Sequence, residues 1–98
     1  MYIVVGLGNP GRKYEHTRHN VGFDVTEILS QKYDIPIRKL MCKAAVGEGT
    51  IRGERVVIAQ PQTFMNLSGE SVVQLLNWYK VDPTHLIVVY DDVDLPEG

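Results

Sequence analysis

The sequence predicts an α/β fold, a three-layer sandwich in which a mixed, mainly parallel sheet lies between helices. Two short segments, residues 2–7 and 86–90, are runs of mostly β-branched apolar residues, which is typical of strands buried on both faces of a parallel sheet. Residues 21–33 and 67–79 instead place their apolar side chains at helical spacing. Because strands and helices alternate along the chain, helices are expected to cover both faces of the sheet.

Local signals set the boundaries of these elements. Gly8 ends the first strand, and Asn20 is a plausible N-cap for the first helix. Gly53 marks a turn of hairpin length between two strands, and Pro61 ends the second of them. Pro83 interrupts the chain after the second helix. The expected elements are, in chain order, a strand over 2–7, a helix over 21–33, hairpin strands over 43–51 and 55–60, a helix over 67–79 and a strand over 86–90.

The composition suits one domain over residues 1–98. The chain has 98 residues, of which 44% are hydrophobic, and it contains no repeat or linker that would divide it. Cys42 is the only cysteine, which excludes an intrachain disulfide and a metal site built from several cysteines. No apolar run is long enough to act as a signal peptide or to span a membrane. These features predict a cytoplasmic protein.

Charge is divided unevenly between the two halves of the chain. Counting Lys and Arg against Asp and Glu, residues 1–55 have a net charge of +3 and residues 56–98 a net charge of −5, which gives −2 for the chain. A phosphate-bearing partner is therefore expected to meet the first half, where Arg12, Lys13 and Arg18 lie close together in sequence. The alternative is that these are ordinary solvated charges.

Three polar clusters directly follow expected strands, at residues 9–20, 63–66 and 91–94. In sheets of this class ligands bind beyond the carboxyl ends of the strands. The clusters are therefore expected to meet at one edge of the sheet and to form an active site. Their residue types, which include His, Asn, Tyr and Asp, favour a hydrolase.

His19 and Asp91 are the expected catalytic pair. A neutral imidazole can take a proton from water near pH 7, and a neighbouring carboxylate orients the ring and stabilises the imidazolium that forms. Asp91 is the first polar residue after the last expected strand, so it is the natural partner of His19. The alternative for His19 is a surface or helix-capping role.

The cluster around Asn66 allows both a structural and a catalytic interpretation. Asn66 precedes the second helix, so its side chain suits an N-cap, but its amide also suits donation to a carbonyl oxygen as negative charge develops there. Phe64 and Met65 beside it would supply apolar or stacking surface for a nucleobase or ribose. Asn9 lies in a tight turn with Pro10, which would hold the Asn9 side chain in one direction.

Two alternative sites fit the sequence less well. Gly6, Gly8 and Gly11 have the spacing of a dinucleotide-binding turn, but Pro10 removes a backbone donor and helical periodicity begins too late for the phosphate to meet a helix N-terminus. Residues 91–94 hold three carboxylates that could bind Mg²⁺. No second carboxylate cluster or phosphate-binding loop accompanies them in the sequence, and the alternative for Asp92 and Asp94 is that they are acidic turn residues before Pro96.

Taken together, the motifs closely resemble those of the bacterial peptidyl-tRNA hydrolase family. The resemblance spans the chain in family order and rests on Gly-Leu-Gly-Asn-Pro-Gly at 6–11, Tyr14, Thr-Arg-His-Asn-Val-Gly at 17–22, Thr-Phe-Met-Asn-Leu-Ser-Gly at 63–69, and the segment 91–98.

The resemblance implies an enzyme that cleaves the ester between a peptide, or an N-blocked amino acid, and the 3′ ribose of tRNA, and it implies no metal or organic cofactor. His19 would be the general base and Asp91 would support it. Asn66 and Tyr14, with Phe64, would contact the tRNA end or the ester. Asn9 would help to distinguish blocked from free aminoacyl substrates.

Members of this family continue past the segment 91–98 by a similar length again, so the chain resembles the N-terminal half of a peptidyl-tRNA hydrolase domain and its α/β sandwich is expected to be incomplete. Weak or absent activity is expected of this half alone. An exposed sheet edge is expected to favour self-association of this half, whereas the family resemblance suggests a monomer. The alternative function is a tRNA-binding fragment without catalysis.

Overall fold

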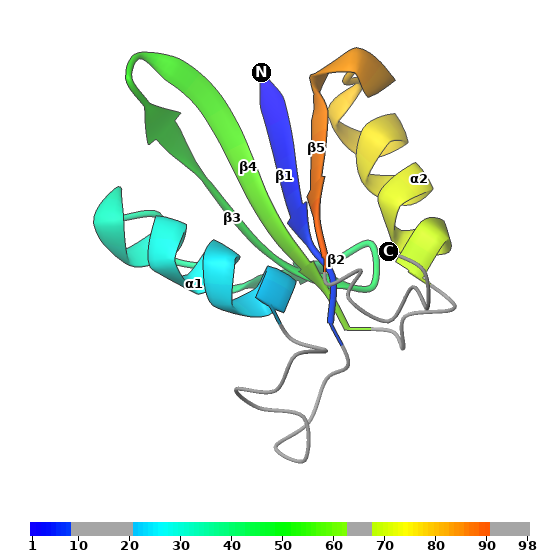
Figure 1. Ribbon diagram of the computed structural model, residues 1–98. Helices are drawn as coiled ribbons and strands as arrows, with labels where there is room; N and C mark the ends of the chain where they lie inside the picture. Colours follow the sequence, from blue (N-terminus) through cyan, green and yellow to red (C-terminus); the bar gives the residue numbers. More distant parts are fainter. Residues whose placement is uncertain (9–20, 63–67, 91–98) are drawn as a thin grey trace, which may run out of the picture.

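The computed structural model describes residues 1–8, 21–62 and 68–90, and these form a five-stranded mixed sheet with one helix on each face (Figure 1). The strand order is β2-β3-β4-β1-β5. The elements are β1 (Tyr2–Gly6), α1 (Val21–Lys32), β2 (Lys39–Met41), β3 (Ala44–Ile51), β4 (Glu54–Pro61), α2 (Ser68–Tyr79), the 3₁₀ turn η4 (Pro83–His85) and β5 (Leu86–Val89). The predicted α/β sandwich is confirmed.

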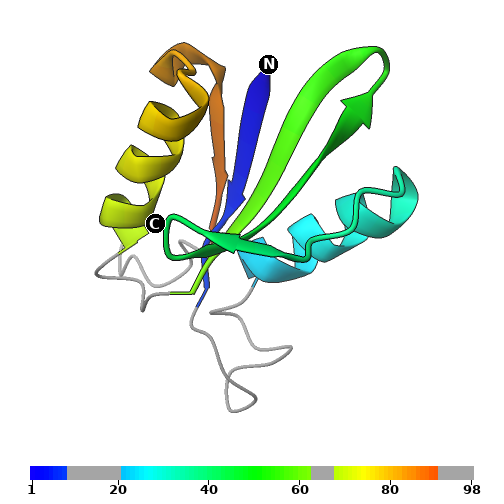
Figure 2. The same cartoon turned by 180° about the vertical axis from the view of Figure 1, so that it is seen from behind.

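β1 lies in the middle of the parallel part of the sheet. It pairs with β4 on one side and with β5 on the other, and both pairings are parallel. The hairpin of β3 and β4 is antiparallel, as is the pairing of β2 with β3. Because the three parallel strands are neighbours, their carboxyl ends lie at the same end of the sheet (Figures 1 and 2).

The core has two parts, one on each face of the sheet. On the α2 face, Ile3 and Val5 of β1 pack in one cluster with the fully buried Leu75 of α2. On the α1 face, Val4 packs in a second cluster with Ile35, which follows α1. This division follows from the strand geometry, since successive residues of β1 point to opposite faces.

The strand β2 was not predicted. It is only three residues long, and it is joined to β3 by a two-residue turn in which Cys42 and Lys43 have φ angles of 53° and 60°. Positive φ at both central positions is the geometry of a type I′ hairpin turn, which usually carries Asn or Gly. Because neither residue is present here, the sequence contains no turn signal at this place. The predicted turn at Gly53, with φ of 82°, is confirmed.

The first turn of α1 lies directly against the ends of β1 and β5. A Cβ atom placed on Gly22 would come within 2.3 Å of the Val89 carbonyl oxygen and 2.4 Å of the Leu7 nitrogen. A Cβ atom on Gly6 would come within 2.2 Å of the Gly22 carbonyl oxygen. Backbone therefore packs on backbone at this point, which only glycine at both positions permits.

Polar contacts attach α2 to the β2–β3 turn near the start of the helix. The Ser71 hydroxyl donates to the Cys42 carbonyl oxygen at 2.7 Å, and the Lys43 ammonium lies 2.8 Å from a carboxylate oxygen of Glu70. Glu70 lies in the first turn of the helix, where a negative charge is stabilised by the helix dipole. The start of α2 therefore has a defined position relative to the hairpin.

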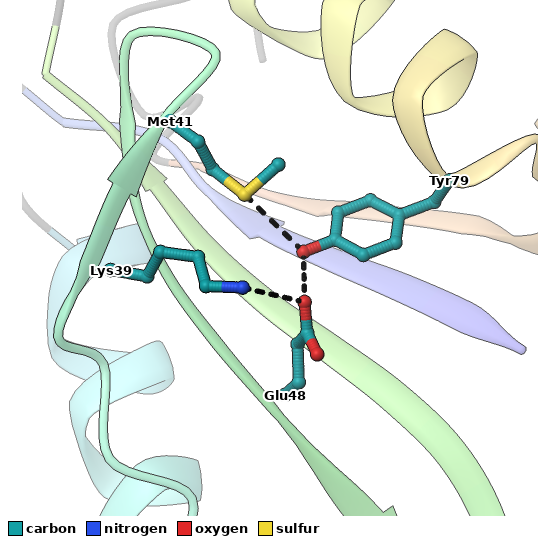
Figure 3. Close-up of polar contacts among 4 residues, drawn as sticks. All are labelled: Lys39, Met41, Glu48 and Tyr79. Atoms are coloured by element: carbon teal, nitrogen blue, oxygen red, sulfur yellow. Dashed lines mark hydrogen bonds and ion pairs between the residues drawn. The ribbon is translucent and has the colours of Figure 1, made fainter.

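A second group of contacts attaches the other end of α2 (Figure 3). The Tyr79 hydroxyl donates to Glu48 Oε2 at 2.5 Å and lies 3.5 Å from the Met41 sulfur, while Lys39 Nζ lies 3.5 Å from the same carboxylate oxygen. The hydrogen bond from Tyr79 holds the pKa of Glu48 below its ordinary value, with Lys39 adding to the effect. Burial, and then the hydrogen bond to Glu48, raises the pKa of Tyr79.

We expect Gly22→Ala to lower the free energy of unfolding by about 1–3 kcal/mol, because its methyl group would overlap backbone atoms that cannot move independently. Urea denaturation followed by circular dichroism measures this. Gly69→Ala is the matched control, since a Cβ atom there meets nothing within 4 Å and Ala favours the helix. Equal stability of the Gly22→Ala variant and the parent would contradict the predicted close contact.

We expect Tyr79→Phe to lower the free energy of unfolding at pH 7 by about 1 kcal/mol, because Glu48 loses the hydrogen bond from the Tyr79 hydroxyl and keeps only its contact with Lys39. The folded-state pKa of Glu48 is depressed, so its stabilising effect is present above its unfolded-state pKa and is lost as the pH falls through the folded-state value. The difference between variant and parent should therefore shrink at acidic pH. Urea denaturation at several pH values tests this, and a difference independent of pH would contradict it.

Candidate functional site

The strands β4, β1 and β5 end side by side at the end of the sheet where the site is expected. Gly6 at the end of β1 is in register with Val89 at the end of β5, and Val5 is in register with Ala59 of β4. The described chain leaves the sheet shortly after each of these positions, at Gly8, Gln62 and Tyr90. The described residues that directly precede the three polar clusters therefore lie at one end of the sheet (Figures 1 and 2).

The predicted site residues themselves lie outside the described residues, so their positions and roles stay predictions. They are Asn9, Tyr14, His19, Phe64, Met65, Asn66 and Asp91. The structure instead describes the backbone that flanks them.

The described residues that flank His19 and Asp91 are in direct contact. His19 is three positions before Gly22 in the sequence, and Asp91 is two positions after Val89. The Leu7 nitrogen donates to the Val89 carbonyl oxygen at 2.9 Å, and Gly22 lies against both of these residues. The described backbone that follows His19 in the sequence thus meets the described backbone that precedes Asp91.

A polar network joins the carboxyl end of β4 to α1, and the sequence did not predict it. The side-chain nitrogen of Gln60 donates to the Thr26 hydroxyl oxygen at 2.9 Å and to a carboxylate oxygen of Glu27 at 3.0 Å. Thr26 is fully buried, and its hydroxyl in turn lies 2.8 Å from the Phe23 carbonyl oxygen and 3.1 Å from that of Gly22.

This network links the end of β4 to the first turns of α1. Its Thr26 hydroxyl also satisfies carbonyl groups near the start of the helix, and buried polar groups are costly unless they are paired in this way. The signal in the sequence was a single polar residue, Gln60, within the otherwise apolar segment 56–61.

The chain that leads into the Asn66 cluster is held at both of its described ends. Before the cluster, the Gln62 nitrogen donates to the Lys43 carbonyl oxygen at 2.8 Å, and the Gln62 side chain donates to the Gln60 carbonyl oxygen at 3.0 Å. After the cluster, α2 begins at Ser68 and is attached through Ser71 as described above. Residues 63–67 therefore connect two points whose positions are fixed by hydrogen bonds.

The described residues include no group of three or more His, Cys, Asp and Glu side chains that could hold a metal ion. The acidic side chains considered for Mg²⁺, Asp91, Asp92 and Asp94, lie outside this part of the chain. The expectation that no metal or other cofactor is required stays a prediction. No helix in the described residues is long and apolar enough to cross a membrane.

The opposite end of β1 carries features that do not belong to the predicted site. A shallow hollow there is lined by residues that include Met1, Glu48 and Arg55. The His85 ring stacks on Tyr2 at a centroid distance of 4.6 Å, and its Nδ1 atom lies 3.1 Å from the Met1 carbonyl oxygen. His85 is therefore engaged at the amino end of the strand, away from the three carboxyl ends.

Comparison with known proteins identifies relatives along the whole chain. It is 58% identical over 98 residues to the peptidyl-tRNA hydrolase of Alkaliphilus metalliredigens and 54% identical over 98 residues to that of Brevibacillus brevis. All of this chain is covered in both comparisons, but only 53% and 52% of the relatives. The chain therefore spans about half the length of these relatives.

Solved structures give the same result. The crystal structure of peptidyl-tRNA hydrolase from Acinetobacter baumannii matches with a TM-score of 0.91 at 38% sequence identity, over 97% of this chain and 49% of that one. The family model of peptidyl-tRNA hydrolase matches residues 3–98, which include the three polar clusters and all of the described sheet except Tyr2. On this evidence the chain belongs to the peptidyl-tRNA hydrolase family.

Proposed function

We propose that this chain supplies the water-activating part of a peptidyl-tRNA hydrolase. The reaction is hydrolysis of the ester between a peptide, or an N-blocked amino acid, and the 3′ ribose of tRNA, which recycles tRNA from peptidyl-tRNA dropped by the ribosome. The observation that carries the proposal is that β4, β1 and β5 end side by side, in a chain that belongs to this family. Each of these ends leads into one of the three polar clusters.

In this proposal His19 removes a proton from the attacking water, and Asp91 orients the imidazole and stabilises its protonated form. The contact between Gly22 and the Val89 carbonyl oxygen supports this pairing. Gly22 is three positions after His19 and Val89 is two positions before Asp91, so the contact brings together backbone close to both residues. An extended chain advances about 3.3–3.6 Å per residue, so the short connections keep both residues close to this contact. A direct hydrogen bond between the two side chains is therefore within reach of the fold.

The remaining predicted residues would bind the substrate. Asn66 donates a hydrogen bond to the ester carbonyl oxygen as charge develops on it, and Asn9 distinguishes blocked from free aminoacyl groups. Tyr14, Phe64 and Met65 would contact the terminal nucleoside or the peptide. Support for this arrangement comes from Gln62 and Ser71, whose hydrogen bonds fix the backbone on either side of the segment that holds Asn66.

The reaction as proposed needs no metal or organic cofactor, because an ester requires only an oriented water, a base and a donor to the carbonyl oxygen. Peptidyl-tRNA is the proposed partner, and the cytoplasm is the proposed location because the substrate arises on the ribosome. A monomer is proposed for a complete family member, whereas this chain alone is expected to self-associate.

We expect the 98-residue chain alone to hydrolyse an N-blocked aminoacyl-tRNA weakly, because it spans about half the length of its relatives. Measuring release of the blocked amino acid under single-turnover conditions, with protein in excess, tests this. A tRNA-binding assay run in parallel separates weak catalysis from binding without catalysis. Multiple rapid turnovers by the purified chain would show that these 98 residues suffice.

We expect His19→Ala to reduce the residual hydrolysis rate by about 10²–10⁴-fold, because a positioned base contributes a factor of this size. His85→Ala is the matched control and should hydrolyse at the parent rate, since His85 lies at the amino end of β1. An unchanged rate for His19→Ala would show that His19 is not the base.

We expect Asp91→Asn to lower the rate and to move the acidic limb of the pH–rate profile to lower pH. Loss of the carboxylate removes a negative charge that favours the imidazolium, so the pKa of His19 should fall. Hydrolysis rates measured between pH 5 and pH 8 test this, with the parent chain as reference. A lower rate with an unshifted limb would argue against a direct contact between the two side chains.

A further inference from the structure

The turn between β2 and β3 holds the chain on both sides of residues 63–67. Directly before this segment, the Gln62 nitrogen donates to the Lys43 carbonyl oxygen at 2.8 Å. After the segment, the Ser71 hydroxyl near the start of α2 donates to the Cys42 carbonyl oxygen at 2.7 Å. Because the two acceptors belong to consecutive residues, one turn attaches the described chain on either side of the segment.

The attachment on the α2 side consists of a buried hydrogen bond and an exposed ion pair. The Ser71 side chain is fully buried, and its hydroxyl is paired with the Cys42 carbonyl oxygen. The Lys43 ammonium lies 2.8 Å from a carboxylate oxygen of Glu70, but these two side chains are 51% and 58% exposed. An exposed ion pair contributes little, whereas a buried polar group that loses its partner is costly. The hydrogen bond of Ser71 is therefore the principal attachment of α2 to the turn.

The backbone of this turn is strained. Cys42 and Lys43 have φ angles of 53° and 60°, in a region that Gly and Asn adopt more readily than other residues. Strained backbone persists where surrounding contacts stabilise it, and such positions concentrate at functional sites. The hydrogen bonds from Gln62 and Ser71 are contacts of this kind. They indicate that the turn has a role beyond reversing the chain.

The other turn of the same hairpin provides a comparison. Between β3 and β4, one of the two central residues is Gly53, with φ of 82°, and a Cβ atom placed there meets nothing within 4 Å. That turn lies at the amino end of β4. The Cys42–Lys43 turn instead lies beside the carboxyl end of β4, since Ala44 is in register with Pro61. It is therefore at the end of the sheet where the active site is proposed.

We propose that the Cys42–Lys43 turn positions Asn66 for the reaction, and that Ser71 is the positioning residue that couples the turn to the start of α2. The inference rests on the proposed function, in which Asn66 donates to the ester carbonyl oxygen. Only residues 63–67 separate the two attached parts of the chain, so release of one attachment allows the segment between them to shift.

The expected consequence of losing the attachment is a slower chemical step without weaker binding. A donor to a developing oxyanion is effective only within a narrow range of distance and direction. A small displacement of Asn66 therefore lowers the rate of the chemical step. Other contacts to the tRNA end do not depend on this geometry, so the affinity for substrate is retained.

The test compares Ser71→Ala with Ser30→Ala in single-turnover hydrolysis of an N-blocked aminoacyl-tRNA. Ser30 is the matched control, because its hydroxyl also donates to a backbone carbonyl oxygen, that of Ile35 at 2.6 Å, near the far end of α1. Ser71→Ala should lower the maximal rate about tenfold, because the donor is displaced and not removed, and should leave the half-saturating protein concentration unchanged. Ser30→Ala should match the parent in both, and thermal melting checks that both variants are folded.

Asn66→Ala shows whether Ser71 acts through Asn66. This substitution alone should lower the rate about 10²–10³-fold, as expected for loss of one donor to the oxyanion. Adding Ser71→Ala to it should lower the rate no further. A merely structural role of Ser71 would instead lower the rate by the same factor with and without Asn66.

A second readout does not require activity. The side-chain amide signals of Asn66 in nuclear magnetic resonance spectra, assigned by their absence in Asn66→Ala, should move in Ser71→Ala and stay in place in Ser30→Ala. Unmoved signals in Ser71→Ala, or an equal loss of rate with and without Asn66, would overturn this inference while the proposed function stands. Hydrolysis by Asn66→Ala at the parent rate would overturn the proposed role of Asn66, and this inference with it.

Discussion

The contact on which the arrangement of this protein depends is the close approach of the first turn of α1 to the ends of β1 and β5. At this point the Gly6 backbone faces the Gly22 carbonyl, and Gly22 in turn faces Val89 and Leu7. Any side chain at either glycine would push the helix away from the strands. The contact therefore determines how near the start of α1 lies to the end of β5, and the sequence places His19 shortly before the first and Asp91 shortly after the second.

The other contacts near the site act in the same way, by fixing backbone rather than by providing chemistry. Gln60 joins β4 to α1 through Thr26 and Glu27, and the hydrogen bonds of Gln62 and Ser71 fix the chain on either side of residues 63–67. The described residues on either side of residues 63–67 thereby have fixed positions. A catalytic group must be held within a fraction of an ångström to be effective, so such supporting contacts matter as much as the groups themselves.

The two edges of the sheet have different physical properties. The β2 edge is short and charged, which suits permanent exposure. The β5 edge is apolar on both faces, with Ile87 and Val88 in partial contact with solvent. Among the described residues, β5 pairs with β1 on one side and with no strand on the other.

The sequence by itself determined the order and type of most elements. Apolar runs and helical spacing identified β1, α1, the β3–β4 hairpin, α2 and β5, because each follows from a local pattern of burial. It also identified the three polar clusters and the family.

The strand β2 was not predicted because its turn at Cys42 and Lys43 lacks the residues that usually accept positive φ. Gln60 was missed because its partners, Thr26 and Glu27, lie more than thirty positions away in the chain. Only the tertiary structure decided that β1 lies between β4 and β5, and that Gly6 and Gly22 meet. These properties depend on contacts between residues distant in sequence, and no local pattern encodes them.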